Sequence, residues 1–400
     1  MNAAAGGPGV PRILYLITDP ISTRLLKGQL AYLRDHGFDV ELASAPGADL
    51  HAFGASEGVV AHELPFVREP SPWKDMRALV ATVRLIRRRR PQVVSASTPK
   101  AGLLGTVAAW LCRVGVRVYV VRGLRFETLT GRRRTLFKAL ERLAVRCSTQ
   151  TLFNSRSLRA LAEYEGIIAP GRGIVLGAGS GNGVDVERFA NLPDKSVVRA
   201  ELGLPDNAFV VGFVGRLVRD KGFVDLIEAF DIAARVREDM RLLVVGDYEP
   251  GDPVDEATRV RVAADMRILH VGWVDEPDQM YAAMDVLAFP SFREGLPNAP
   301  LEAQAAGVPV VGYTATGTVD AVSPAPCSRL VQIGDVQALA TALVAAANCP
   351  VAGSSSSSWV RDRFDRRQVH STLRDHFGLW QGAVDEKFAV GIPRYSGDTP

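Results

Sequence analysis

The stretch Phe289-Pro-Ser-Phe-Arg-Glu-Gly-Leu-Pro-Asn-Ala-Pro-Leu-Glu302 joins a short apolar run to a helical pattern through a turn rich in Gly and Pro. The apolar run, 286–290, has the length and composition of a buried strand. Pro300 suits the first position of a helix, so Glu294 is expected on the loop and Glu302 in the first helical turn. A strand that passes directly into a helix is the repeating unit of a parallel sheet wound with helices.

The same alternation of strand and helix patterns extends along both halves of the chain. In the second half, strands are expected at 209–215, 241–245, 268–271, 286–290 and 308–312, and helices at 223–237, 255–265, 276–284, 300–306 and 336–348. In the first half, strands are expected at 12–17, 39–44, 93–96, 116–121, 150–153 and 173–176, and helices at 25–36, 73–90, 101–114 and 132–147. This pattern predicts two doubly wound α/β domains, whose strand ends face a shared cleft.

The length of 400 residues also favours two domains, because it exceeds what one hydrophobic core usually serves. The Gly-rich stretch 177–185 has the composition of a linker, and we expect a first domain over 1–190 and a second over 191–358. The Ser run 354–358 is expected to end the second domain. A helix over 359–380 is expected to pack back toward the first domain, and 381–400 to form a flexible tail.

The net charge of +3 hides a strong asymmetry between the halves. Residues 1–190 carry 27 Lys and Arg against 15 Asp and Glu, whereas 191–400 carry 20 against 29. A basic half suits anionic lipid, a pyrophosphate-bearing acceptor or nucleic acid, and charge alone does not choose among them. No basic motif interleaved with aromatic residues supports nucleic acid.

The start of the sequence, 1–11, lacks the basic and apolar regions of a signal peptide. The longest apolar stretch, 101–112, is shorter than the roughly 20 residues that a membrane-spanning helix needs. We therefore expect a cytoplasmic protein. The four cysteines have no metal-ligand spacing, and all are expected to be reduced thiols that serve packing: Cys112, Cys147, Cys327 and Cys349.

Two constellations in the second half suit a nucleotide sugar. Glu294 and Glu302 can each accept hydroxyl hydrogen bonds from a sugar or ribose, and the helix start between them offers backbone N–H groups to a diphosphate. Arg216 and Lys221 flank a second strand-to-helix loop, where two cations can neutralise the charge on a departing diphosphate. The six histidines show no metal-ligand spacing and no Asp-x-Asp motif is present, so neither a metal nor another cofactor is expected.

These two constellations together resemble the family 4 retaining glycosyltransferases, which have the GT-B fold of two Rossmann-like domains. The resemblance covers roughly residues 12–380. It implies that Arg216 and Lys221 contact the donor diphosphate, that Glu294 contacts the transferred sugar and that Glu302 binds the ribose. Further donor contacts are implied, mostly from backbone groups, at Gly215, Val274, Gly295, Leu296, Pro297 and Asn298.

The first half departs from the family pattern. The chain reads Thr18-Asp-Pro-Ile-Ser-Thr23 where many members have a Gly-rich turn, and Arg122-Gly123 where a common pattern has His-Gly. Arg122 stays protonated and cannot act as a general base, but it suits an anionic group, and a proton-transfer role for Glu127 stays open. Acceptor-side candidates are thus Thr98, Lys100, Arg122 and Glu127.

Within the family, the stretches 97–102, 122–127 and 293–298 resemble bacterial enzymes of capsule, O-antigen and exopolysaccharide synthesis. The resemblance implies a retaining transfer from a nucleoside-diphosphate sugar, expected to be a UDP-sugar, to a glycan on undecaprenyl diphosphate. The basic helices 84–90 and 132–146, with the apolar Trp73, Leu136, Phe137 and Leu140, suit a peripheral position at the inner face of the membrane.

Two other functions fit the same architecture. A UDP-sugar 2-epimerase shares the two-domain fold, but it needs acid and base groups at the sugar C2 and uses no acceptor. A non-catalytic protein that binds membranes or anions is the third hypothesis. The paired cations and paired carboxylates favour sugar transfer over both, while the identity of the sugar, acceptor and oligomer stays open.

Overall fold

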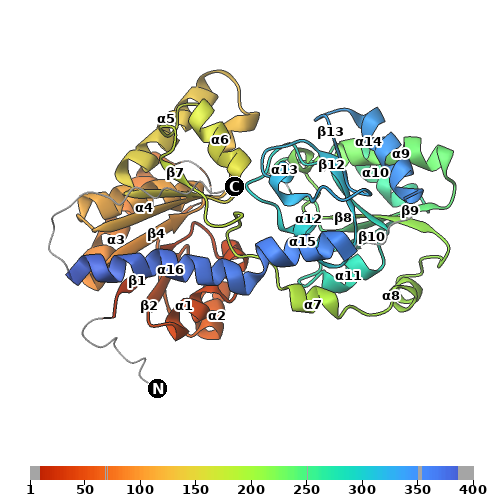
Figure 1. The fold of residues 1–400 in the computed structure, drawn as a ribbon. Coiled ribbons are helices and arrows are strands. Elements are labelled where there is room, and N and C mark those ends of the chain that lie inside the picture. The colour runs from red at the N-terminus through yellow and green to blue at the C-terminus, as the bar shows by residue number, and fades with distance from the viewer. Residues whose placement is uncertain (1–9, 68, 70, 250, 350–353, 386–400) are drawn as a thin grey trace.

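The computed structural model describes residues 10–67, 69, 71–249, 251–349 and 354–385, which form two parallel sheets, each wound with helices (Figure 1). The first sheet has the strand order β3-β2-β1-β4-β5-β6-β7. Its strands are β1 (Arg12–Leu16), β2 (Asp39–Ser44), β3 (Val60–Glu63), β4 (Val93–Ser97), β5 (Val116–Val121), β6 (Gln150–Phe153) and β7 (Gly173–Ile174). All neighbouring pairs are parallel. The predicted doubly wound fold is confirmed for this half.

Helices cover both faces of the first sheet. Its elements are η1 (Pro20–Leu26), α1 (Gln29–Asp35), α2 (Ala48–Glu57), α3 (Pro72–Arg89), α4 (Pro99–Leu111), η2 (Arg125–Thr128), α5 (Gly131–Cys147) and α6 (Arg156–Tyr164). Helices α3, α4 and α5 lie side by side on one face. Gly105 lets α4 approach the sheet closely, because a Cβ there would lie 2.6 Å from Leu16 and 2.9 Å from Ala96.

The second sheet has the order β10-β9-β8-β11-β12-β13, again with all neighbours parallel. Its strands are β8 (Phe209–Val214), β9 (Met240–Val245), β10 (Ile268–Gly272), β11 (Val286–Phe289), β12 (Val310–Tyr313) and β13 (Arg329–Val331). Its further elements are η3 (Arg219–Lys221), α9 (Phe223–Val236), α10 (Glu256–Ala264), α11 (Asp278–Ala282), α12 (Asn298–Ala305), α13 (Thr318–Ala321) and α14 (Val336–Ala347). Two buried hydrophobic clusters, one on each face, hold this sheet. The doubly wound prediction is confirmed here as well.

The chain crosses between the two domains twice at one place. The Gly-rich stretch leads into α7 (Val186–Ala190) and α8 (Lys195–Glu201), and Val184, Val186 and Phe189 already pack in the core of the second domain. The return crossing pairs with the first, because Val184 N–H donates to Phe364 O and Arg366 N–H donates to Val184 O, both at 2.8 Å.

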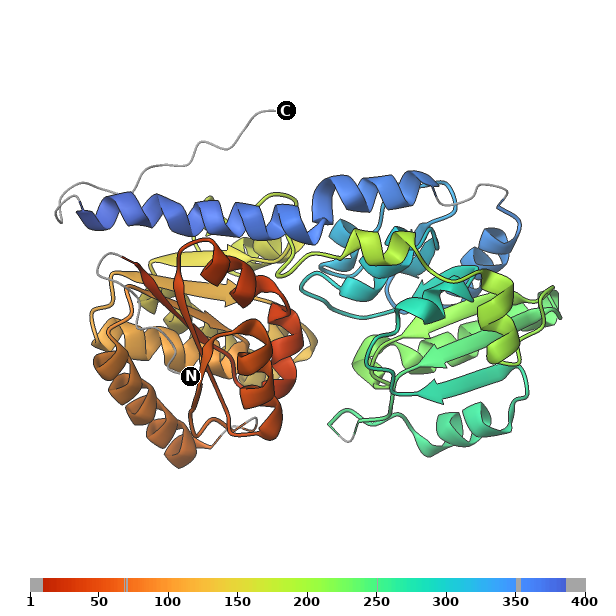
Figure 2. The ribbon, with the colours of Figure 1, turned by 90° about the horizontal axis from the view of Figure 1, so that it is seen from below.

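Two helices follow the second domain and lie along one side of the molecule (Figure 2). Helix α15 (Ser354–Phe364) packs against α12, and α16 (Arg366–Asp385) continues to the first domain, where Phe377 joins the core beside Phe38. Residues 359–364 thus lie on the second domain, and only the part from Arg366 onward reaches the first.

Several local predictions were wrong. The Ser run 354–358 is not a separator but the first part of α15, and 381–385 continue α16, while the rest of the predicted tail lies outside the described residues. The edge strand β3 was missed because it contains no buried apolar run.

The cysteine prediction was wrong for one pair. Cys327 and Cys349 form a disulfide, with their Cα atoms 5.7 Å apart, although 22 positions separate them in the sequence. The fold brings together the loop before β13 and the end of α14, which their spacing alone does not reveal. Cys112 and Cys147 are free.

Candidate functional site

The loop between β11 and α12 carries the predicted donor carboxylates. Helix α12 begins at Asn298, two residues before the predicted start at Pro300. Glu302 therefore lies in the second helical turn, which corrects the prediction of the first. The earlier start is compatible with Pro300 because the first turn of a helix has no intrahelical partner for its N–H groups, so Pro is tolerated throughout that turn, and the extended Pro297 is the N-cap.

Glu294 pairs with Lys221, although 73 positions separate them. Ser291 Oγ donates a second hydrogen bond to the same carboxylate at 2.8 Å. The Lys221 and Glu294 side chains are only 20% and 12% exposed, so solvent screens their attraction less than it screens a surface pair. The structure thus unites two predicted residues and adds Ser291, which sequence reasoning missed.

Arg216 takes a different partner. It follows β8, and its Nη1 lies 2.7 Å from Glu249 Oε2 in the loop after β9. The loops after β8 and β9 pack closely, because a Cβ at Gly246 would lie 1.9 Å from the carbonyl oxygen of Gly215. Glu249 was missed because a lone loop carboxylate carries no signal in the sequence. Any anion that binds Arg216 must compete with the Glu249 carboxylate.

Glu302 lies in a more buried setting than a helix-surface carboxylate. Its Oε2 accepts a hydrogen bond from the Tyr281 hydroxyl at 2.9 Å. Burial raises the pKa of Glu302, while the Tyr281 hydrogen bond and the charges of Arg366 and Arg188 oppose this shift. The carboxylate is thus oriented by α11 from one side.

The other predicted donor-loop residues divide between the core and the domain contact. Leu296 is buried in a hydrophobic cluster with Val274 packed against it, Pro297 is buried and Asn298 is exposed. Gly295 meets the first domain: a Cβ there would lie 2.1 Å from the carbonyl oxygen of Arg122. Only glycine permits this approach, so the donor loop touches the first domain through backbone atoms.

Thr98 and Lys100 are engaged within the first domain. Thr98, at a φ of 70°, places its hydroxyl 2.7 Å from that of Thr18, which also accepts the Ala101 N–H at 3.0 Å. Lys100 donates to Asp75 Oδ1 at 2.7 Å and to the carbonyl oxygen of Glu69, in the loop before α3. These residues tie the β1 and β4 loop ends and α3 together.

Arg122 and Glu127 are half-buried where the domains meet. Burial lowers the pKa of Arg122 to about 10, with Tyr15 opposing the shift. Burial raises the pKa of Glu127 to about 7, opposed by Thr316 and Arg293 of the second domain. The Glu127 carboxyl therefore titrates near neutrality at the domain contact.

This pKa shift predicts a pH-dependent stability. The pKa of Glu127 rises from an ordinary 4.5 to about 7 on folding. The folded state therefore holds the proton more tightly, and this contribution to the free energy of unfolding is fully present below pH 4.5 and is lost as the pH rises through about 7. Between about pH 5 and pH 8, we expect the melting temperature of the wild type to fall relative to that of Glu127→Gln. Other groups, including Glu141, titrate in both proteins and cancel. Parallel melting curves across this pH range would contradict the shift.

The domains also contact each other through charged side chains. Lys27 Nζ lies 2.6 Å from Glu276, Arg24 lies 3.0 Å from Asp275, and Ser157 N–H donates to Asp320 at 2.9 Å. These contacts come from segments far apart in the sequence. They join the two domains, and the Ser157 contact lies near the donor loop, because Gly317, which donates to Ser157 Oγ, would place a Cβ 2.6 Å from the Gly295 carbonyl oxygen.

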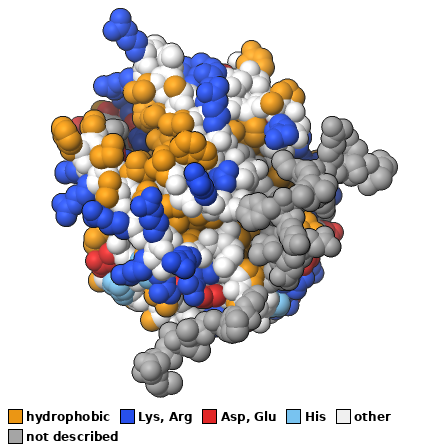
Figure 3. Space-filling model, turned by 90° about the vertical axis from the view of Figure 1, so that its left-hand side faces the viewer, with side chains coloured by type: hydrophobic (Ala, Val, Ile, Leu, Met, Phe, Trp, Pro, Cys, Tyr) orange, Lys and Arg blue, Asp and Glu red, His pale blue; other side chains and the backbone are white. Residues whose placement is uncertain are grey.

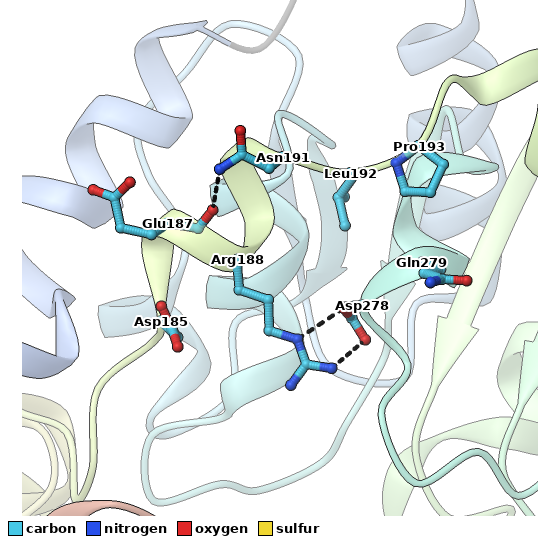
Figure 4. A pocket seen from close by; sticks show the side chains of 8 residues that line it. All are labelled: Asp185, Glu187, Arg188, Asn191, Leu192, Pro193, Asp278 and Gln279. Carbon is cyan, nitrogen blue, oxygen red and sulfur yellow. Dashed lines mark hydrogen bonds and ion pairs between the residues drawn. The ribbon is translucent and has the colours of Figure 1, made fainter.

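A surface hollow of about 550 Å³ lies beside α7, as Figure 4 shows. Arg188 reaches across it to Asp278 with two hydrogen bonds of 2.8 and 2.7 Å. Its cation is therefore already paired. Among the described residues that line this hollow, none is a predicted site residue.

The described part of the chain has neither a cluster of metal ligands nor a helix that could cross a membrane. Its His, Cys, Asp and Glu residues form no group of three or more suited to a metal ion. None of its helices combines the length and apolar composition needed to cross a membrane.

Known proteins resemble this chain over most of its length. Family models match at residues 23–179 (glycosyl transferase 4-like domain) and 208–348 (glycosyl transferases group 1). The capsular polysaccharide biosynthesis glycosyltransferase CapM of Staphylococcus aureus is 34% identical over 329 residues, covering 82% of this chain and 86% of its own. The UDP-Gal:alpha-D-GlcNAc-diphosphoundecaprenol alpha-1,3-galactosyltransferase of Escherichia coli is 29% identical over 317 residues, covering 78% and 81%.

The fold also matches solved structures. Anabaena HepE, solved in complex with UDP-glucose, aligns with a TM-score of 0.75 at 21% identity, covering 92% of this chain and 99% of that one. This likeness supports the two-domain architecture, and the sequence likeness to CapM extends across both domains. The chain therefore belongs to the family 4 glycosyltransferases of the GT-B fold and is a glycosyltransferase enzyme.

Proposed function

We propose that this enzyme transfers a sugar, with retention of configuration, from a UDP-sugar to a hydroxyl of a glycan carried on a lipid diphosphate, in bacterial capsule or related surface polysaccharide synthesis. The pairing of Lys221 with Glu294 carries the proposal, because it sets a diphosphate-binding cation beside a sugar-binding carboxylate. The names of the two bacterial relatives support capsule synthesis, a UDP donor and a diphosphoundecaprenol acceptor.

Each donor group has a proposed role. Lys221 and Arg216 stabilise the departing diphosphate, Arg216 after exchanging Glu249 for a phosphate oxygen. Glu294 accepts hydrogen bonds from the transferred sugar, and the Glu302 carboxylate accepts them from the ribose. Gly215, directly after β8, and Gly295 and Asn298 of the donor loop supply backbone groups. The two cations provide the positive charge at the diphosphate without a metal or other cofactor.

The reaction exchanges one bond at the anomeric carbon for another. The bond from that carbon to the diphosphate oxygen breaks, and the bond to the acceptor oxygen forms on the same face. The acceptor proton passes to the departing diphosphate, which leaves as UDP. This course needs no covalent nucleophile from the enzyme.

A panel of UDP-sugars, incubated with the pure enzyme and a lipid-diphosphate sugar, tests the proposal. UDP release that depends on the acceptor, with a product of retained anomeric configuration, is the expected result. Epimer formation without an acceptor would instead support the 2-epimerase. Absence of acceptor-dependent release across the panel would count against transfer to this class of acceptor.

We further propose that the first domain docks on the inner face of the cytoplasmic membrane. Helix α3 exposes Trp73 (85%) and Met76 (56%) beside Arg77 and Arg84, and these side chains border a hollow of about 630 Å³. Figure 3 shows hydrophobic and basic side chains intermingled at this end of the molecule. An exposed tryptophan among cations suits the interface of an anionic bilayer.

Removing this apolar contact should release the enzyme from vesicles. Trp73→Ala combined with Met76→Ser should weaken sedimentation with phosphatidylglycerol vesicles by roughly tenfold or more, because burying each large side chain contributes about 1.5–3 kcal/mol. Met266→Ser on the second domain, at a site 96% exposed, is the matched control and should bind as the wild type does. Equal vesicle binding by the wild type, the double variant and the control would exclude α3 as the docking face.

A further inference from the structure

Two buried polar groups of the first domain have no hydrogen-bond partner among the described residues. Tyr15, in β1, is 4% exposed, and within the described residues its hydroxyl has no hydrogen-bond partner. The Nε of Arg122, which directly follows β5, is likewise buried without a partner in that part of the chain. The two lie on nearby strands, because Tyr15 pairs with Ser95 of β4, which pairs in turn with Val118 of β5, and Arg122 directly follows β5. The charge of Arg122 accordingly lowers the pKa of Tyr15, against the larger effect of burial, which raises it.

The guanidinium of Arg122 lies where the interdomain connection and both domains converge. A Cβ at Gly181, in the Gly-rich connection, would lie 2.1 Å from Arg122 Nη1 and 3.2 Å from Asn154 Nδ2. On its backbone side, Arg122 meets Gly295 of the donor loop. The half-buried guanidinium therefore lies against the neutral Gly181 backbone, and Arg122 is close to the loop that carries Glu294.

Another arginine of the chain, Arg199, has partners for its guanidinium that Arg122 lacks among the described residues. Arg199 is 3% exposed, and it pairs with Asp285 at 2.6 Å and donates to three backbone carbonyls. For Arg122, by contrast, no carboxylate partner is found among the described residues. Burying an ionised group without a counter-charge is costly, and a bound anion removes that cost.

The geometry points to a phosphoryl site: we propose that Arg122 and Tyr15 bind a phosphate group of the acceptor. A guanidinium fork matches two phosphate oxygens, and the tyrosine hydroxyl can donate to a third. The acceptor is favoured over the donor because Arg216 and Lys221, on the second domain, already serve the donor diphosphate. The choice of acceptor rests on the proposed function, whereas the phosphoryl chemistry rests on the unpaired groups.

Calorimetry with inorganic pyrophosphate tests the site in the full chain. The enzyme is first saturated with UDP, so that the donor cations are occupied, and pyrophosphate is then titrated. We expect Arg122→Met to weaken pyrophosphate binding about 10- to 100-fold and Tyr15→Phe to weaken it several-fold, as for charge-assisted hydrogen bonds. If the variants instead weaken binding of UDP itself, the phosphoryl group belongs to the donor and the assignment to the acceptor is overturned.

Tyr15→Phe separates binding from folding. It removes a hydroxyl without a described partner, so its melting temperature should equal or exceed that of the wild type. The matched control is Tyr119→Phe, because the buried Tyr119 hydroxyl donates to Glu141 at 2.6 Å. The control should melt at a lower temperature and bind pyrophosphate normally.

The outcomes distinguish this site from the proposed function. Unchanged UDP and pyrophosphate binding by a folded Tyr15→Phe and Arg122→Met would overturn the site, even if sugar transfer proceeds. Pyrophosphate binding that depends on Arg122, in an enzyme that transfers no sugar to a lipid diphosphate, would retain the site and reject the function. With an active enzyme, both variants should raise the KM for the acceptor more than that for the donor.

Discussion

Lys221→Met should lower kcat by about 100- to 1,000-fold while the protein keeps its fold, because one preorganised charge at a developing anion contributes that much. Lys221 lies in the short turn η3, outside the hydrophobic core, and methionine keeps most of the length of its side chain, so the substitution opens no core cavity. Glu294 loses its cation but keeps the hydrogen bond from Ser291. Initial rates of UDP release, measured over a range of donor concentrations, give kcat and KM separately.

Arg219→Met provides the matched control. Arg219 belongs to the same turn and is exposed, so it tests a loss of positive charge without a change at Glu294. Its kcat should stay within a few-fold of the wild type. If Lys221→Met raised only the KM for the donor, Lys221 would bind ground state and transition state equally, and the proposed role at the departing diphosphate would be wrong.

Glu294→Gln should reduce kcat/KM for the UDP-sugar by on the order of a hundredfold or more, yet leave the affinity for UDP nearly unchanged. UDP lacks the sugar that Glu294 is proposed to hold, so the substitution should be visible only with the complete donor. Glutamine keeps the size of the side chain and can still accept the Ser291 hydrogen bond. Calorimetry with UDP, alongside initial rates, checks both halves of this expectation.

Glu302→Gln should give the reverse result. Its proposed partner is the ribose, which UDP and UDP-sugar share, so the affinity for both should fall together. The Tyr281 hydroxyl can still donate to the amide oxygen, which preserves the local packing. If both glutamine variants lost UDP affinity equally, the division between a sugar carboxylate and a ribose carboxylate would fail.

The sequence predicts the fold well where a strand is buried and its residues are therefore apolar. The buried strands β8 and β11 are apolar runs that end at Gly and Pro, so the sequence alone predicts where their loops begin. The edge strand β3 gives no such signal, because its four residues are exposed or half-buried. Helix α12 shows the usual limit at a boundary: Pro300 is tolerated throughout the first turn, so it cannot fix the exact start.

The candidate site was predicted by residue type but not by contact. Lys221 and Glu294 were identified from separate loops, and nothing in either loop specifies that their side chains pair. Glu249 and Tyr15 could not be identified at all, because a loop carboxylate and a strand tyrosine are common in any α/β domain. Glu249 matters because it pairs with the cation of Arg216, and Tyr15 because its buried hydroxyl has no partner in the described part of the chain.

The paired crossings at Val184 and Phe364–Arg366 make the two domains a tethered system. A single flexible connection would leave many relative orientations of the domains open, and this would lower the effective concentration of a ligand on one domain at the site on the other. Two crossings that share hydrogen bonds restrict the motion toward rotation about one line, so the local concentration of donor around acceptor stays high. A chain ending at Phe364 would lose this restraint along with α16, and its turnover should suffer even if each domain still binds its own ligand.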